Sequence, residues 1–177
     1  MRGSFRNYAE ELTRQAAQSG GYFTSSQAVA AGFADSVHGI MVRKGTWLKV
    51  MRGIYRLAAF PEPAWPELTI YSLWSRDRSG CPQGVYTHDT ALSIHAGIIS
   101  SQAAVHMTVP LLFRKHADVP KGLMLHKQDL PAEAWEQRDG YRVLGKEWMD
   151  EAGRFVPLAA GCGKVQGYDA VIQAGED

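Results

Sequence analysis

The sequence predicts an α+β protein built from two parts, and three observations support this prediction. Apolar residues make up 45% of the 177 positions and charged residues 21%, which is typical of a globular chain with its own core. Helix-like segments and a hairpin fill the first 60 residues, whereas strands and helices mix after residue 66. Residues 61–66 (PEPAWP) lie between the two parts and contain three prolines, which favours a linker over a regular element.

The composition also argues against several protein classes. No apolar run approaches the roughly 18 residues of a membrane span, and Glu10 and Glu11 lie where a signal peptide would be apolar. The two cysteines, Cys81 and Cys162, are far apart and form no CxxC motif, which argues against a disulfide scaffold or a zinc finger. We therefore expect a soluble, cytoplasmic protein that does not bind a membrane.

Charge is distributed unevenly along the chain. Residues 1–60 carry eight basic and three acidic side chains, a net charge of +5. The remainder carries 11 basic and 15 acidic side chains, a net charge of −4. A basic part followed by an acidic part suggests that the first faces a polyanion and the second faces a different partner.

The first part opens with three predicted helices. Apolar residues recur at helical spacing over residues 5–18, and a glycine pair follows them. Thr24 and Gln27 form the T-x-x-Q pattern of a capping box, which opens a second helix that Gly32 closes. Asp35 is placed to cap a third helix (SVHGIMVRK), which Gly45 ends. Two short helices joined by a tight turn make a helix-turn-helix.

A hairpin follows the three helices. A strand is predicted to start at Trp47, Arg52 and Gly53 supply a turn, and the extended pattern resumes at Ile54. Three helices and a basic hairpin, in this order, are the parts of a winged helix-turn-helix. In that fold the third helix enters the major groove of DNA and the hairpin lies along the backbone.

The predicted third helix offers candidate base-reading residues. A helical projection directs one apolar face at the core, formed by Val37, Ile40 and Met41. The residues that point away are Ser36, Gly39 and Arg43, with His38 at the edge. Arg43 is expected to read a base, because its planar guanidinium can pair both acceptors of a guanine edge. Ser36 and His38 are expected to contact bases or phosphates.

Four further basic residues are placed to contact phosphates, where charge matters more than geometry: Lys44, Lys49, Arg52 and Arg56. Alternatively, Arg43 and Lys44 only complement the helix dipole, and the hairpin arginines are ordinary solvated surface. Gly39 is unusual, because glycine inside a helix costs about 1 kcal/mol relative to alanine. It either permits a close approach to the groove or only weakens the helix.

Four short motifs in the first part resemble a known family. They are G-x-F-T at residues 21–24, Q-A…G at residues 27–32, K-G-x-W at residues 44–47 and R-G-I-Y-x-L at residues 52–57. Together they resemble the N-terminal domain of AbiEi-type antitoxins and related transcriptional regulators. The resemblance implies a regulator that represses its own promoter at inverted repeats and counteracts a co-encoded nucleotidyltransferase-like toxin.

The second part is predicted to be a small mixed α/β domain over residues 67–144. Proline at residue 66 suits the first turn of a helix, and residues 84–97 read as a strand that runs into another helix. AAVHMTVP, GLMLHKQDL and GYRVLG predict further strands. Residues 84–127 also resemble the second segment of the same regulator family, through Thr87, His88, Thr90, Ala91, Leu92, His95 and Gly97.

The chain contains six histidines, which are candidate metal-binding or catalytic residues. His88 and His95 are seven residues apart, so they share a helical face, and Asp89 adjoins the first. The chain has no compact zinc-ligand spacing, no HExxH motif, and no phosphate-binding loop or nucleophile motif. We therefore predict that His88 supports the strand-to-helix turn and that His95 fills the interior. We predict no catalytic residue, no metal and no cofactor.

The C-terminal residues 145–177 differ from the rest of the chain. They contain six glycines in 33 residues, against 12 in the preceding 144, and do not match the family. We interpret them as a shortened or altered C-terminus, such as a shift of reading frame would produce. Functions that relatives place in this region are not carried over.

The sequence thus predicts a regulator without enzymatic activity that binds double-stranded promoter DNA, with a homodimer on inverted repeats and a toxin as a further partner. Two alternatives from other classes remain. One is a protein-interaction module that uses exposed Trp47 and Tyr55 on a winged scaffold. The other is a metal-dependent hydrolase or nuclease centred on His88, Asp89 and His95.

Overall fold

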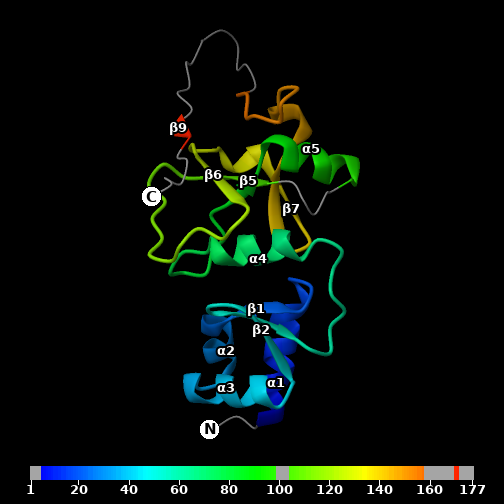
Figure 1. Cartoon of the computed structure of the whole chain (residues 1–177), viewed down its shortest axis with the longest axis vertical. Coiled ribbons are helices and arrows are strands. Elements are labelled where there is room, and N and C mark those ends of the chain that lie inside the picture. Colours follow the sequence, from blue (N-terminus) through cyan, green and yellow to red (C-terminus); the bar gives the residue numbers. More distant parts are fainter. Residues whose placement is uncertain (1–4, 99–103, 158–169, 172–177) are drawn as a thin grey trace. The chain divides into compact units, whose positions relative to one another are not determined.

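The computed structural model of the chain describes residues 5–98, 104–157 and 170–171, and it is a mixed α+β structure with two sheets (Figure 1). The chain divides into two compact units. The first unit extends to Pro82 and includes Asp139–Tyr141, and the second unit begins at Gln83. The division therefore falls after the helix that starts at Pro66, and not at the proline-rich residues 61–66.

The first unit contains four helices and a three-stranded sheet within the described residues. The elements are α1 (Phe5–Ala17), β1 (Tyr22–Thr24), α2 (Ser25–Ala31), α3 (Asp35–Arg43), β2 (Trp47–Met51), β3 (Ile54–Leu57) and α4 (Pro66–Trp74). The strands are antiparallel in the order β1-β3-β2. Helices α1 to α3 and the hairpin β2–β3 agree with the sequence prediction in type and order.

An aromatic core holds these elements together. Phe23 of β1 and Phe33, which follows α2, both meet the ring of Trp47 edge-on, with ring centroids 4.9 and 5.2 Å apart. Leu12 and Ala16 bring α1 to the same cluster and are almost fully buried. Burying large aromatic side chains supplies most of the hydrophobic stabilisation available to a unit of this size. Helix α4 packs against β1 and β3.

Local signals account for the ends of several elements. The Thr24 hydroxyl accepts a hydrogen bond from the Gln27 backbone, and the Gln27 side chain accepts one from the Thr24 backbone, so the predicted capping box is confirmed. Gly32 ends α2 with φ of 111°, and Gly53 turns the hairpin with φ of 75°. The prediction that Asp35 caps α3 is wrong. Asp35 is the first helical residue, and Ala34 is the N-cap, without a side-chain hydrogen bond.

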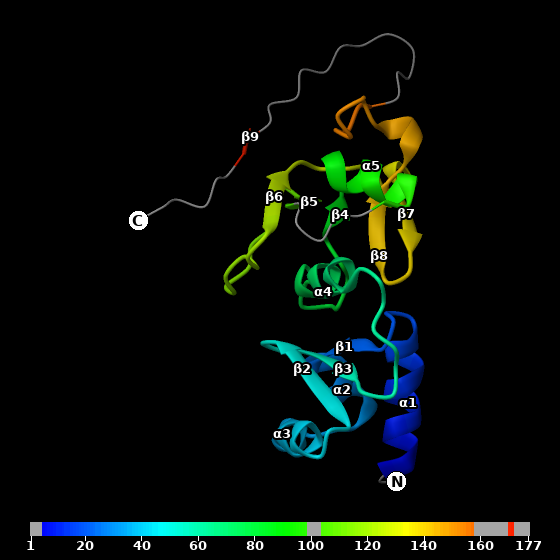
Figure 2. The same cartoon turned by 45° about the vertical axis from the view of Figure 1, so that its right-hand side comes forward.

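Within the described residues, the second unit is built on a six-stranded mixed sheet in the order β7-β8-β4-β5-β6-β9. Its elements are β4 (Val85–Tyr86), α5 (His88–Ala96), β5 (Val105–Val109), β6 (Leu123–Lys127), η1 (Ala132–Ala134), β7 (Trp135–Arg138), β8 (Tyr141–Leu144), η2 (Lys146–Trp148) and β9 (Ala170–Val171). Strands β5 and β6 are parallel neighbours, and α5 packs against β5 (Figure 2). Strand β7 was not among the predicted elements.

Two further predictions concern membrane-spanning helices and the C-terminal residues. Among the described residues, no helix is both long enough and apolar enough to cross a bilayer. Of the glycine-rich residues 145–177, positions 158–169 and 172–177 lie outside the described residues. The interpretation of that segment as a shortened or altered C-terminus therefore stays a prediction.

Candidate functional site

Helix α3 exposes Ser36, Gly39 and Arg43 as predicted, but Ile40 and His38 take other positions than predicted. Met41 and His38 are its buried residues, whereas Ile40, expected in the core, is 39% exposed. The exposed residues Ser36, Gly39, Ile40 and Arg43 recur at intervals of three and four, so they form one continuous line along the helix. We call these four residues the outward stripe. The inward assignment of Ile40 was wrong because His38 occupies the core position in its place.

The side chain of His38 is buried and does not lie on the exposed face of α3. Its side chain is 5% exposed, and its ring packs against Trp47 and Tyr55 with centroids 5.3 and 5.9 Å apart. The Nδ1 atom lies 3.7 Å from the Asp35 carboxylate, and Nε2 is buried with no hydrogen-bond partner among the described residues. The prediction that His38 is a DNA-binding residue is corrected: its ring is part of the contact between α3 and the sheet.

Trp47 is also buried, with 1% of its surface exposed. Tyr55 is half-buried and stacks on Phe23, with ring centroids 5.8 Å apart. These two aromatic residues therefore stabilise the first unit internally. The alternative of a protein-interaction surface built on an exposed Trp47 is wrong.

Three of the four predicted phosphate-binding residues are exposed. Lys44 is the C-cap residue of α3, and Arg52 lies in the hairpin turn. Lys49 lies opposite Tyr55 across the strand pair, so both side chains leave the same face of the sheet. The His38 ring of α3 packs against the Tyr55 ring on that face, and α3 lies beside β2 (Figure 2). The three exposed cations therefore lie at the C-terminus of α3 and on the hairpin that follows it.

Arg56 has a different environment. It lies one residue from Tyr55 along β3, so its side chain leaves the opposite face of the sheet. Its guanidinium donates a hydrogen bond to the Phe60 carbonyl at 2.7 Å and lies 5.9 Å from the centroid of the Tyr22 ring. Burial raises the pKa of Tyr22, and the nearby charge of Arg56 partly opposes that rise. We therefore remove Arg56 from the set of phosphate-binding candidates, because a side chain on this face is separated from α3 by the sheet.

The two histidines predicted to share a helical face do not form one site. His95 is almost buried, its Nε2 lies 2.8 Å from the Leu144 carbonyl oxygen, and its Nδ1 lies 3.1 Å from an Arg138 nitrogen. It connects α5 with β7 and β8, as expected of an interior residue. His88 lies instead in a second group of residues. The hydrolase or nuclease site predicted at His88, Asp89 and His95 is therefore not assembled.

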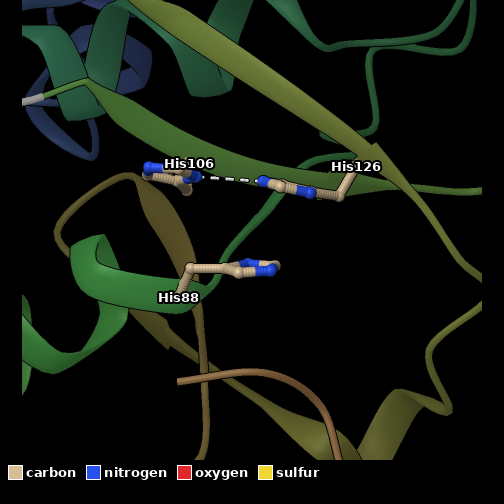
Figure 3. A group of neighbouring side chains, drawn as sticks. All are labelled: His88, His106 and His126. Atoms are coloured by element: carbon tan, nitrogen blue, oxygen red, sulfur yellow. Dashed lines mark hydrogen bonds between the residues drawn. The ribbon is translucent and has the colours of Figure 1, made fainter. Parts of the chain in front are cut away.

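That second group consists of His88, His106 and His126, which we call the histidine cluster (Figure 3). The His88 ring stacks on the His126 ring with centroids 3.9 Å apart and planes 17° apart. His106 Nδ1 lies 3.0 Å from His126 Nε2, close enough for a hydrogen bond between the two rings. One potential ligand nitrogen from each ring lies within 4.8 Å of the other two.

The fold of the second unit creates this cluster from distant parts of the sequence. His106 and Thr108 alternate with apolar residues along β5, and the parallel register places His126 of β6 beside Thr108. Side chains at these positions leave the same face of the sheet. His88, the first residue of α5, completes the group from the helix that packs against β5. Sequence spacing gave no signal for the cluster, because its ligands depend on strand pairing.

Comparison of the sequence with protein-family models and with curated proteins found no match. The resemblance to the AbiEi-type regulators therefore stays a prediction from the motifs.

Proposed function

We propose that the protein is a sequence-specific DNA-binding regulator that uses the first unit as a winged helix-turn-helix. The order α1, β1, α2, α3, β2 and β3 supports this proposal, because it is the order of parts that such a domain requires. The observation that carries it is the outward stripe of α3, accompanied by exposed cations at its C-terminus and on the adjoining hairpin.

Each residue of the outward stripe suits a different contact in the major groove. Arg43 can donate two hydrogen bonds to a guanine edge, and Ser36 can bond to a base or a phosphate. Ile40 can pack against a thymine methyl group, which gives an exposed apolar side chain a role in base readout. Lys44, Lys49 and Arg52 supply charge for the phosphates.

Alanine variants distinguish base readout from phosphate binding. Arg43→Ala should weaken binding to the protein's own promoter by about 1–3 kcal/mol and reduce the preference for that sequence. Lys49→Ala should weaken binding to promoter and scrambled duplexes alike and make the salt dependence shallower by about one unit of slope. Fluorescence anisotropy with both duplexes measures these quantities.

Arg114→Ala is the matched control, because Arg114 is an exposed arginine of the second unit. It should bind both duplexes as the wild type does. Equal losses for Arg43→Ala on promoter and scrambled DNA would contradict the assignment of Arg43 to base readout.

We further propose, from the resemblance of its motifs, that the protein acts as a dimer on inverted repeats and as the antitoxin of a nucleotidyltransferase-like toxin. Co-expression with the adjacent gene of the operon tests the antitoxin role. The product of that gene should arrest growth alone and be tolerated together with this protein. Growth arrest that persists in the presence of this protein would contradict the antitoxin role and leave DNA binding to be judged by its own experiment.

A further inference from the structure

We propose that the histidine cluster binds a divalent transition-metal ion, with Zn²⁺ as the expected ion, through one ring nitrogen each of His88, His106 and His126. This site is separate from the residues assigned to DNA, because all three histidines belong to the second unit. Binding of metal and binding of DNA can therefore be tested independently of each other.

The spacing of the rings is close to that of a metal site. Zinc binds imidazole nitrogens at about 2.0–2.1 Å, so two nitrogens of a tetrahedral site are roughly 3.3 Å apart. His106 Nδ1 and His126 Nε2 are 3.0 Å apart, and the three ligand atoms together lie within 4.8 Å. The pair from β5 and β6 thus already has the required separation, and His88 lies within a short movement of it.

We expect rotation of the His106 and His126 rings to form the site. The three rings are nearly parallel, with interplanar angles of 17° to 26°, whereas metal binding needs their lone pairs aimed at one point. Rotation about the bond between Cβ and the ring is soft for histidine, so the backbone can stay in place. The hydrogen shared between His106 and His126 moves to the other nitrogen of the ring that carries it. Both rings then bind the ion as neutral imidazoles.

The surroundings of His88 hold it in position for this role. Its Nδ1 lies 2.9 Å from the Thr87 hydroxyl, which in turn lies 2.8 Å from the Thr108 hydroxyl on β5. A hydrogen bond to the second nitrogen of a histidine orients the ring and fixes its tautomer in metal sites. The His88 backbone has φ of 53° and donates a hydrogen bond to the Gly153 carbonyl at 2.6 Å. Gly153 packs so closely on His88 that a Cβ at residue 153 would overlap the His88 backbone.

The donor set favours particular ions and leaves a position open. Three imidazoles suit zinc, nickel or copper and are poor ligands for magnesium or calcium. Three protein ligands leave the fourth position of a tetrahedral ion for water or for an anionic group. The ion would also tie α5 to β5 and β6, so binding should stabilise the second unit against unfolding.

Metal binding is tested with the untagged full chain, which is first stripped of metal by chelation, then incubated with Zn²⁺ and freed of excess ion. We expect one Zn²⁺ per chain by elemental analysis, a rise in the thermal unfolding temperature with Zn²⁺, and no rise with Mg²⁺. Bound Co²⁺ should give the visible absorption of a four- or five-coordinate site with nitrogen ligands. A wild-type protein that retains no Zn²⁺ and gives no such absorption would overturn the proposal.

Two variants and a control locate the site. His126→Phe keeps a ring for stacking on His88 but lacks a ligand nitrogen, so its Zn²⁺ affinity should fall at least tenfold. Thr87→Val removes the hydroxyl that orients His88, and its affinity should fall about tenfold. His116→Gln changes an exposed histidine outside the cluster and should bind Zn²⁺ as the wild type does.

Zn²⁺ affinity that is unchanged in His126→Phe would overturn the assignment, as would a loss of affinity in His116→Gln. Circular dichroism shows whether each variant is folded. If His126→Phe is unfolded, His106→Gln takes its place with the same expected loss, and unchanged affinity in that variant is the contradicting result.

Discussion

At the scale of single residues, His38 shows how burial changes a functional assignment. A histidine on a predicted recognition helix resembles a DNA contact in sequence, but here its ring fills the space between α3, Trp47 and Tyr55. The residue types around it do not reveal this, because an imidazole is equally compatible with a surface and with a mixed interior. Ile40 is the counterpart, an apolar residue that the fold leaves on the surface.

Variants of His38 test this burial. His38→Ala should lower the free energy of unfolding by roughly 2–3 kcal/mol, because it leaves a cavity beside two aromatic rings. His38→Phe keeps the ring packing and removes the buried nitrogen that has no partner, so it should retain both stability and promoter affinity. Chemical denaturation and DNA binding are the measurements. A His38→Phe protein that is folded but binds promoter DNA weakly would show that the imidazole itself contacts DNA.

Glu11 supplies a prediction about pH. Hydrogen bonds from Arg14 and Gln15 lower the pKa of Glu11 from 4.5 to about 2. Because the folded-state pKa is below the unfolded one, the contribution to stability is present above about pH 4.5 and is lost as pH falls through 2. In an NMR titration the carboxyl should have its midpoint near 2, and Arg14→Ala should move it towards 4.5. A midpoint that does not move in Arg14→Ala would contradict this explanation.

At the scale of elements, local chemistry made most helices and strands predictable. The Thr24 and Gln27 capping box and the proline that starts α4 act through neighbours in the sequence, so a pattern can detect them. Strand β7 (WEQR) lacks alternating apolar residues and was missed. It is an edge strand of the sheet. The Arg142 guanidinium carbon lies 4.0 Å from the centroid of the Trp135 ring, and this contact exists only once the sheet has formed.

Gly39 tests whether the α3 backbone approaches DNA closely. A Cβ at this position would meet only an Arg43 side-chain nitrogen at 4.0 Å, so alanine fits. Gly39→Ala should therefore raise the free energy of unfolding by about 1 kcal/mol. Because Gly39 lies on the outward stripe, the added methyl group should also weaken promoter binding.

Gly45→Ala is the comparison for the stability measurement. Its φ of 71° strains any residue with a side chain, so this variant should be less stable although space around it is open. Promoter affinity that is unchanged in a stabilised Gly39→Ala protein would contradict a close approach of the α3 backbone to the groove.

At the scale of the whole molecule, the sequence predicted two parts but not their extents. The prolines of residues 61–66 indicate an interruption of regular structure, yet the following helix α4 buries Leu68 and packs against β1 and β3. The histidine cluster was equally hidden, because it depends on the parallel pairing of β5 and β6. Pairing between separated strands is not encoded in local patterns, and this explains why the order of elements was predictable and the cluster was not.

At the scale of the whole molecule, the charge distribution also determines how DNA affinity should depend on salt concentration. The first 60 residues carry a net charge of +5, and Lys44, Lys49 and Arg52 are exposed there. Because Arg56 is held on the opposite face of the sheet, we expect three of the four predicted basic side chains to neutralise a DNA phosphate each. The logarithm of DNA affinity should then fall with the logarithm of salt concentration with a slope of about −3.

Titration of the full chain with two duplexes over a range of salt concentrations is the most direct test of sequence-specific DNA binding by the first unit. One duplex is the DNA directly upstream of the gene, and the other is a scrambled duplex of the same composition. We expect tighter binding to the upstream duplex at every salt concentration, with the slope given above. Equal affinity for the two duplexes, or an affinity that does not respond to salt, would contradict the claim.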